Sequence, residues 1–143
     1  MAALSAPRKT DSLSGGAIPA FLDLPVAADA VIFAGGMVQC DATGYATAAL
    51  VDTDLICFGV ALASADATGL DDGDLTVRVQ SGAFWLNNSS SGDLITIAER
   101  GQACYVVNDQ TVAKTDGSAS RSVAGRVLDA TATQVLVMLL PLG

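Results

Sequence analysis

The sequence predicts an all-β protein, a small antiparallel β-barrel or sandwich that follows an irregular N-terminal arm. Short runs rich in Val, Ile, Thr and aromatic residues recur between turn clusters every ~8–12 residues, a spacing typical of these folds. Fourteen of the fifteen acidic residues are Asp, which favours turns over helix interiors. The chain closes with two strand–turn–strand units, over residues 103–114 and 122–140.

The first 27 residues differ from the rest. Residues 1–16 are small, polar and glycine-containing, and they show no hydrophobic period. Residues 18–26 are apolar but carry Pro19 and Pro25, and proline disfavours both helix and central strand. We therefore expect an arm over 1–27 and a β-rich domain over 28–143. The arm either docks on a partner or forms a disordered leader.

The strands of the β-rich domain are of two kinds. Residues 75–80 alternate Leu, Val and Val with Thr, Arg and Gln, which predicts a strand with one wet face. Residues 55–62 and 135–140 are apolar on both faces. A single small barrel has one interior, so we expect the second face of each to meet a loop, the arm or another subunit. Burial of such side chains would favour an oligomer.

Composition excludes several classes of function. The formal charge is −8, and the basic residues beyond Arg8 and Lys9 are well separated, so we expect no nucleic-acid partner. Three cysteines without CxxC spacing predict neither a disulfide framework nor a zinc site, and Cys57 and Cys104 are expected to be small buried hydrophobes. No segment has the length of a membrane span or the pattern of a signal peptide. We expect synthesis in a reducing cytoplasm and no membrane partner.

Candidate chemistry is sparse. The chain has no histidine, which removes the commonest general base. Asp71-Asp72-Gly73-Asp74 resembles part of a calcium loop but lacks its closing Glu, and it is expected to be an Asp-rich turn. Two alternatives stay open. One is a carboxylate-dependent hydrolase at these aspartates, and the other is a glycan- or receptor-binding module using Trp85 and loop 87–92. We expect no enzyme activity and no cofactor.

Several short motifs follow one another in a fixed order: Phe58-Gly59-Val60-Ala61, Leu75 to Val79, Gly82 to Trp85, Gly92-Asp93, Gly101-Gln102, Tyr105 entering a strand, and Val123-Ala124-Gly125-Arg126-Val127. In this order the stretch from about residue 30 to residue 140 resembles the capsid cement, or head-decoration, proteins of tailed bacteriophages.

The resemblance implies a non-enzymatic virion protein. Such proteins assemble on the outer surface of the capsid as compact β-rich subunits, commonly homotrimers, and bridge major capsid protein subunits. The expected localisation is the capsid surface, after synthesis in a host bacterium. We assign capsid contact to Ile18, Phe21, Leu22, Leu24 and Val26. We assign the contact between subunits to Leu136, Met138, Leu140 and Trp85.

Overall fold

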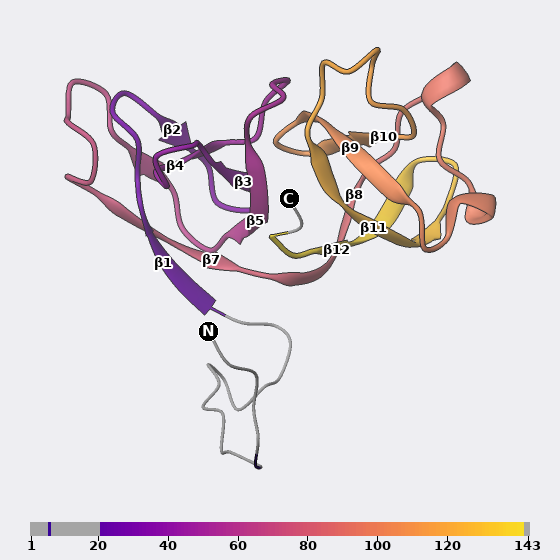
Figure 1. The fold of residues 1–143 in the computed structure, drawn as a ribbon, viewed down its shortest axis with the longest axis horizontal. Helices are drawn as coiled ribbons and strands as arrows, with labels where there is room; N and C mark the ends of the chain where they lie inside the picture. The colour runs from indigo at the N-terminus through magenta and orange to yellow at the C-terminus, as the bar shows by residue number, and fades with distance from the viewer. Residues whose placement is uncertain (1–5, 7–20, 142–143) are drawn as a thin grey trace.

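The computed structural model describes Ala6 and residues 21–141, and its strands form two lobes that lie side by side (Figure 1). The N-terminal lobe contains β1 (Phe21–Pro25), β2 (Val31–Ile32), β3 (Met37–Cys40), β4 (Ala46–Ala48), β5 (Ile56–Ala61), β6 (Ala65–Asp66) and β7 (Thr76–Gln80). The C-terminal lobe contains β8 (Gly82–Asn87), β9 (Ala103–Asn108), β10 (Thr111–Ala113), β11 (Val123–Ala130) and β12 (Gln134–Leu139). Its short 3₁₀ turns are η2 (Ser91–Asp93) and η3 (Ile97–Glu99). The predicted all-β class is confirmed.

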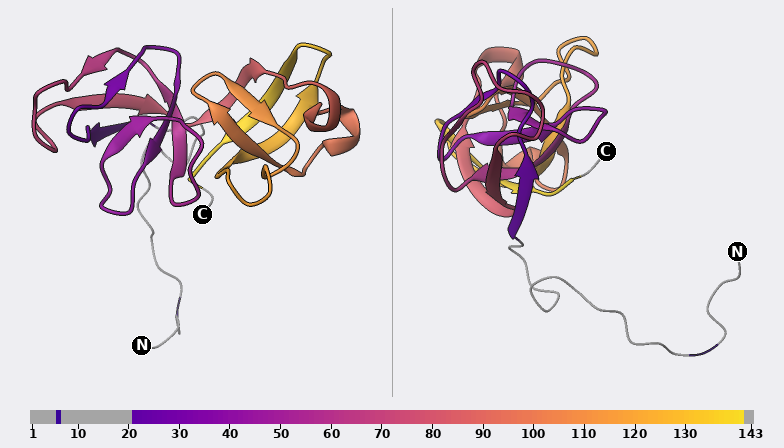
Figure 2. Two further views of the ribbon diagram at one scale, coloured as in Figure 1. Left: turned by 90° about the horizontal axis from the view of Figure 1, so that it is seen from above. Right: turned by 90° about the vertical axis from the view of Figure 1, so that its left-hand side faces the viewer.

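The C-terminal lobe is a closed barrel with the strand order β10-β8-β12-β11-β9. The N-terminal lobe is a five-stranded sheet in the order β1-β7-β5-β3-β4, and β2 and β6 pair separately. This sheet curls so far that the chain after β1 meets β4, where Val26 and Ala46 form a parallel bridge. β7 leads into β8 through Ser81 alone, so one long strand path joins the lobes (Figure 2).

Both predicted closing hairpins form, although the first turns one residue later than the Asn108-Asp109 turn that the sequence favours. β9 and β10 pair antiparallel around the Asp109-Gln110 turn, and β11 pairs antiparallel with β12. β7 has the predicted wet face: Thr76 and Arg78 are exposed, whereas Val77 and Val79 are buried. In the described residues no helix is long and apolar enough to cross a membrane.

The chain has two hydrophobic cores, and β3 and β5 form the wall between them. Met37, Cys57 and Val60 pack in the core of the C-terminal lobe. Val38 and Ala61, on the same two strands, pack in the core of the N-terminal lobe. The middle of the apolar run 55–62 is therefore covered on both faces within one chain, whereas Ile56 and Leu62 near its ends are exposed. The second face of the run meets the N-terminal core, to which Val26 and Leu24 of the predicted arm also contribute. Of the three partners that the sequence left open, the structure shows the end of the predicted arm.

The predicted arm of residues 1–27 is too long by its last seven residues. β1 pairs antiparallel with β7 from Phe21↔Gln80 to Pro25↔Thr76, and Val26 is fully buried in the N-terminal core. Pro25 is tolerated because β1 is an edge strand. The Val26 N–H donates to the Leu75 carbonyl, so by alternation the N–H that Pro25 lacks would face the free edge.

Candidate functional site

The outer surface of the C-terminal barrel carries an apolar patch on β8, β11 and β12. Trp85 on β8 lies directly opposite Leu136 on β12, and Met138 lies two residues further along β12. Their neighbours Val135, Val137 and Leu139 point into the core and are fully buried, so alternation places Leu136 and Met138 outside. The Trp85 side chain is 47% exposed and Leu128 on β11 is 39% exposed. We call Trp85, Leu128, Leu136 and Met138 the outer patch.

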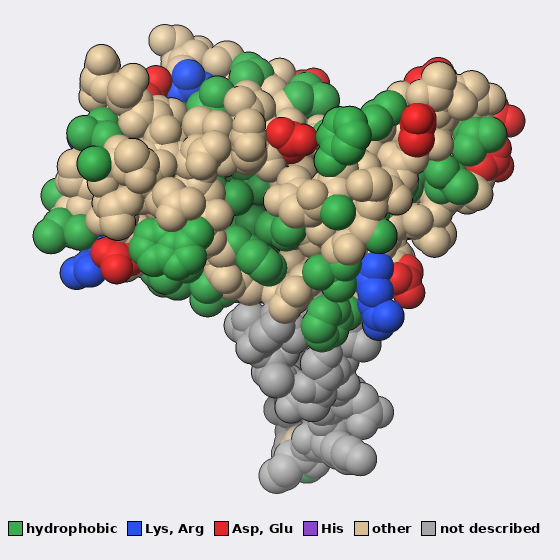
Figure 3. Space-filling view, turned by 180° about the vertical axis from the view of Figure 1, so that it is seen from behind, with side chains coloured by type: hydrophobic (Ala, Val, Ile, Leu, Met, Phe, Trp, Pro, Cys, Tyr) green, Lys and Arg blue, Asp and Glu red, His purple; other side chains and the backbone are tan. Residues whose placement is uncertain are grey.

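The structure thus brings together three of the four residues assigned to subunit contact. Leu140, the fourth, follows the end of β12 and is half-buried. One side of the molecule shows a band of hydrophobic side chains with few charged groups among them (Figure 3). Exposed apolar surface of this kind marks interaction sites in soluble proteins.

The residues assigned to capsid contact divide into four groups. Ile18 lies outside the described residues. Val26 is buried and presents no surface to a partner, whereas Leu22 and Leu24 are half-buried on β1. Phe21 is the most exposed of them at 39%, and the Arg78 guanidinium lies over its ring at 5.5 Å from the centroid. Of the residues on this strand that were assigned to capsid contact, Phe21 therefore presents the most surface.

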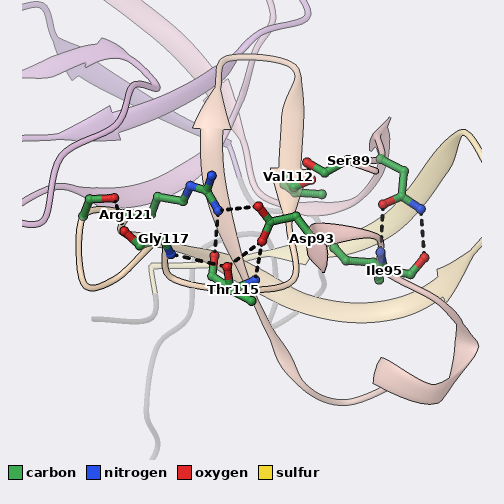
Figure 4. Close-up of polar contacts among 9 residues, drawn as sticks. Ser89, Asp93, Ile95, Val112, Thr115, Gly117 and Arg121 are labelled. Carbon is green, nitrogen blue, oxygen red and sulfur yellow. Dashed lines mark hydrogen bonds and ion pairs between the residues drawn. The ribbon is translucent and has the colours of Figure 1, made fainter. Parts of the chain in front are cut away.

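Loop 87–92, which the glycan-binding alternative requires, is tied to the barrel by its own polar side chains. The Asn88 amide donates to the carbonyls of Ile95 and Thr131, and its oxygen accepts from the Ile95 N–H at 3.0 Å. The Ser89 hydroxyl donates to the Val112 carbonyl at 2.9 Å (Figure 4). These groups are occupied within the chain. Trp85 stands outside this network, on the outer face of β8.

Asp93, of the Gly92-Asp93 motif, fastens η2 to the loop between β10 and β11. Its carboxylate accepts from the Thr115 hydroxyl at 2.5 Å and from Arg121 Nη1 at 3.2 Å (Figure 4). The Thr115 hydrogen bond, followed by Arg121, lowers the pKa of Asp93 below its ordinary value. Both side chains of the ion pair are mostly covered. The network joins η2 to the loop between β10 and β11.

The Asp71–Asp74 turn uses two of its carboxylates to hold the backbone. Asp72 Oδ1 accepts from the Ala28 N–H at 2.7 Å, and Asp74 Oδ2 accepts from the Asp71 N–H at 3.0 Å. Gly73 adopts a φ of 80° there, a conformation that favours glycine. No group of three or more His, Cys, Asp or Glu side chains in the described part of the chain is placed to hold a metal ion.

The three cysteines are free and buried, which confirms the prediction for Cys57 and Cys104. Desolvation raises the pKa of Cys57 and of Cys104 to about 12, and that of Cys40 to about 11. A thiol with so high a pKa holds almost no thiolate at neutral pH and is a poor nucleophile.

A surface hollow of about 440 Å³ beside the outer patch was not foreseen from the sequence. It is lined by Ala98, Glu99, Gln102, Ala103, Tyr105, Lys114 and Arg126. The Ala-Gly-Arg-Val motif could have indicated Arg126 as a surface residue, since Arg126 lies between the buried residues Gly125 and Val127. Alternation places such an arginine on the outer face of its strand.

Comparison of the chain with protein-family models, with curated proteins and with solved structures found no match.

Proposed function

We propose that the chain is a non-enzymatic capsid cement protein of a tailed bacteriophage. In this proposal it binds the outer surface of the capsid as a homo-oligomer, with a trimer as the expected form, and bridges subunits of the major capsid protein. The order of motifs from Phe58 to Val127 supports the family, and the outer patch supports association. The exposed Phe21 on β1 is the proposed capsid contact nearest to the N-terminus.

The observation that carries the proposal is the outer patch, in which Trp85 and Leu128 are exposed while Leu136 and Met138 are half-buried. Both cores close within one chain, yet Trp85 and Leu128 remain well exposed. Covering an apolar side chain of this size contributes on the order of 1.5–3 kcal/mol when burial is complete. A structural protein that must stay on a shell can use such a surface without any catalytic group.

Binding to purified expanded capsids tests the proposal. The protein should co-sediment with capsids at low and at high salt, since apolar contacts are little screened by ions. Trp85→Ala should weaken binding to the capsids. Ile97→Ala is the matched control, a truncation of another exposed apolar side chain, on η3, and it should not weaken this binding. Absence of co-sedimentation at every salt concentration would overturn the capsid assignment.

The glycan- or receptor-binding module remains the second candidate because the Trp85 indole is half exposed. Sugars stack on such rings but also need polar groups beside them, and the residue directly opposite Trp85 is Leu136, whereas Gln134 lies opposite Asn87. Glycan-array binding that is lost in Trp85→Ala, without any capsid binding, would favour this candidate over cement.

A further inference from the structure

Arg126 differs from every other basic residue that the structure describes. Each of the other four forms an ion pair, and these pairs are Arg78–Asp23, Arg100–Asp129, Lys114–Glu99 and Arg121–Asp93. Arg126 has no acidic partner among the described residues, although the chain carries a formal charge of −8. An unpaired arginine on so acidic a chain is available to a carboxylate from elsewhere.

The hollow around Arg126 leaves its guanidinium free to bind. Arg126 Nη1 donates to the Gly101 carbonyl at 3.3 Å, and its other N–H groups meet no acceptor among the described residues. Lys114 Nζ is held by Glu99 Oε1 at 3.3 Å, while Glu99 Oε2 accepts from the Thr96 N–H. Glu99 is thus committed to Lys114 and Thr96. A planar guanidinium can take a carboxylate through two parallel hydrogen bonds.

This hollow lies at the border of the outer patch. In the register of the barrel, Met138 on β12 lies opposite Ala83 on one side and opposite Arg126 on the other. Arg126 in turn lies opposite Ala103 on β9, which lines the hollow. The surface therefore offers an apolar area with a cationic edge. A segment that fits this surface would present an apolar side chain followed by carboxylates.

The chain itself presents such a segment on its other lobe. Leu70 is exposed and precedes Asp71, Asp72 and Asp74, all three of which are exposed. None of these three carboxylates forms an ion pair with a described basic residue. The turn lies just before β7, at the left-hand end of Figure 1, whereas the Arg126 hollow lies on the C-terminal lobe.

We propose that the Arg126 hollow binds the Leu70–Asp74 turn of a second copy of this chain. Arg126 pairs with Asp71 of the second copy, and Leu70 covers part of the outer patch. The contact joins different surfaces of the two copies, so it is heterologous and closes into a ring when the rotation allows. This inference rests on the proposed homo-oligomer and names the surfaces that hold it together.

Charge reversal tests the pairing. Asp71 is the carboxylate to change because Asp72 and Asp74 hold the turn, whereas no hydrogen bond to the Asp71 side chain is found in the described residues. The set is Arg126→Glu, Asp71→Lys, the double variant, and Asp54→Lys as a control with the same change of charge at another exposed site. The readout is the association constant from sedimentation equilibrium at low and high salt.

Each single reversal should weaken association by about tenfold or more at low salt, because like charges now meet at the contact. The double variant should recover most of this loss, and Asp54→Lys should match the unchanged chain. Three results would overturn the pairing. The chain without substitutions could be a monomer, all variants could have the same association constant, or the double variant could associate as weakly as the single variants. Co-sedimentation of the unchanged chain with capsids reports separately on the cement proposal, so the two failures are distinguishable.

Discussion

The backbone of Gly125 on β11 lies so close to Met138 on β12 that a Cβ at residue 125 would fall 2.0 Å from the Met138 carbonyl oxygen. The obstacle is backbone and cannot rotate away. Gly125→Ala should therefore lower the free energy of unfolding by roughly 1–3 kcal/mol, as overpacking does in other cores. Gly92→Ala is the control, since a Cβ there meets nothing within 4 Å. Urea denaturation of both variants checks this, and equal stability would contradict the close approach.

The Asp93 network should make the free energy of unfolding depend on pH in the acidic range. The pKa of Asp93 is lowered in the folded state, first by the Thr115 hydroxyl and then by Arg121. Its stabilising effect is therefore complete above the unfolded-state pKa of about 4 and is lost as the pH falls through the folded value. Asp93→Asn should lower the free energy of unfolding at pH 7, and the difference from the unchanged chain should shrink toward pH 2. Asp54→Asn, at an exposed carboxylate, should show no such difference.

Gln39 is the one described side chain with a buried polar atom that has no partner. It is fully buried on β3; Oε1 accepts from the Leu50 N–H at 3.0 Å, and Nε2 has no acceptor among the described residues. Burying an unsatisfied donor costs roughly 1–3 kcal/mol. Gln39→Met removes that donor at similar volume and also removes the acceptor of the Leu50 N–H. Leu50 is exposed, so water can replace that acceptor, and stability should stay unchanged or rise. A loss above about 2 kcal/mol would contradict this expectation.

Two truncations separate the sheet from the residues before it. Removal of residues 1–27 deletes β1 and the buried Val26, so it should lower the melting temperature strongly or prevent folding. Removal of residues 1–20 leaves β1 intact and should preserve the free oligomer. Under the cement proposal, the shorter truncation weakens capsid binding, because the predicted arm contains Ile18. If the protein without residues 1–20 binds as many sites on the capsid as the full chain does, these residues are not part of the capsid contact.

The sequence predicts the strands well and their arrangement less well. The alternation in residues 75–80 and the turn residues of the last two hairpins are local features of the sequence. They therefore predict β7 and the strands from β9 through β12 without information on which strands pair. The two-core architecture depends on which strands meet in space. A run such as 55–62 is apolar on both faces whether its second face meets a neighbouring lobe or a neighbouring subunit, and periodicity cannot distinguish these.

The candidate site was likewise predictable where it depends on local alternation and not where it depends on the pairing of strands. Leu136 and Met138 could be assigned to one face by alternation along β12, and Trp85 joins them because β8 pairs with β12. Arg126 could not be linked to them from the sequence, because its position opposite Met138 depends on the register between β11 and β12. Val26 was misplaced since nothing in the sequence separates an apolar edge strand from an apolar arm.

The cement proposal is decided by the number of copies bound per capsid when the purified protein is mixed with expanded capsids of the phage that, under this proposal, encodes it. The expected result is saturable binding with a fixed number of copies, which is retained at high salt and reduced by Trp85→Ala but not by Ile97→Ala. Capsids that carry no bound protein after sedimentation, at low and at high salt, would contradict it.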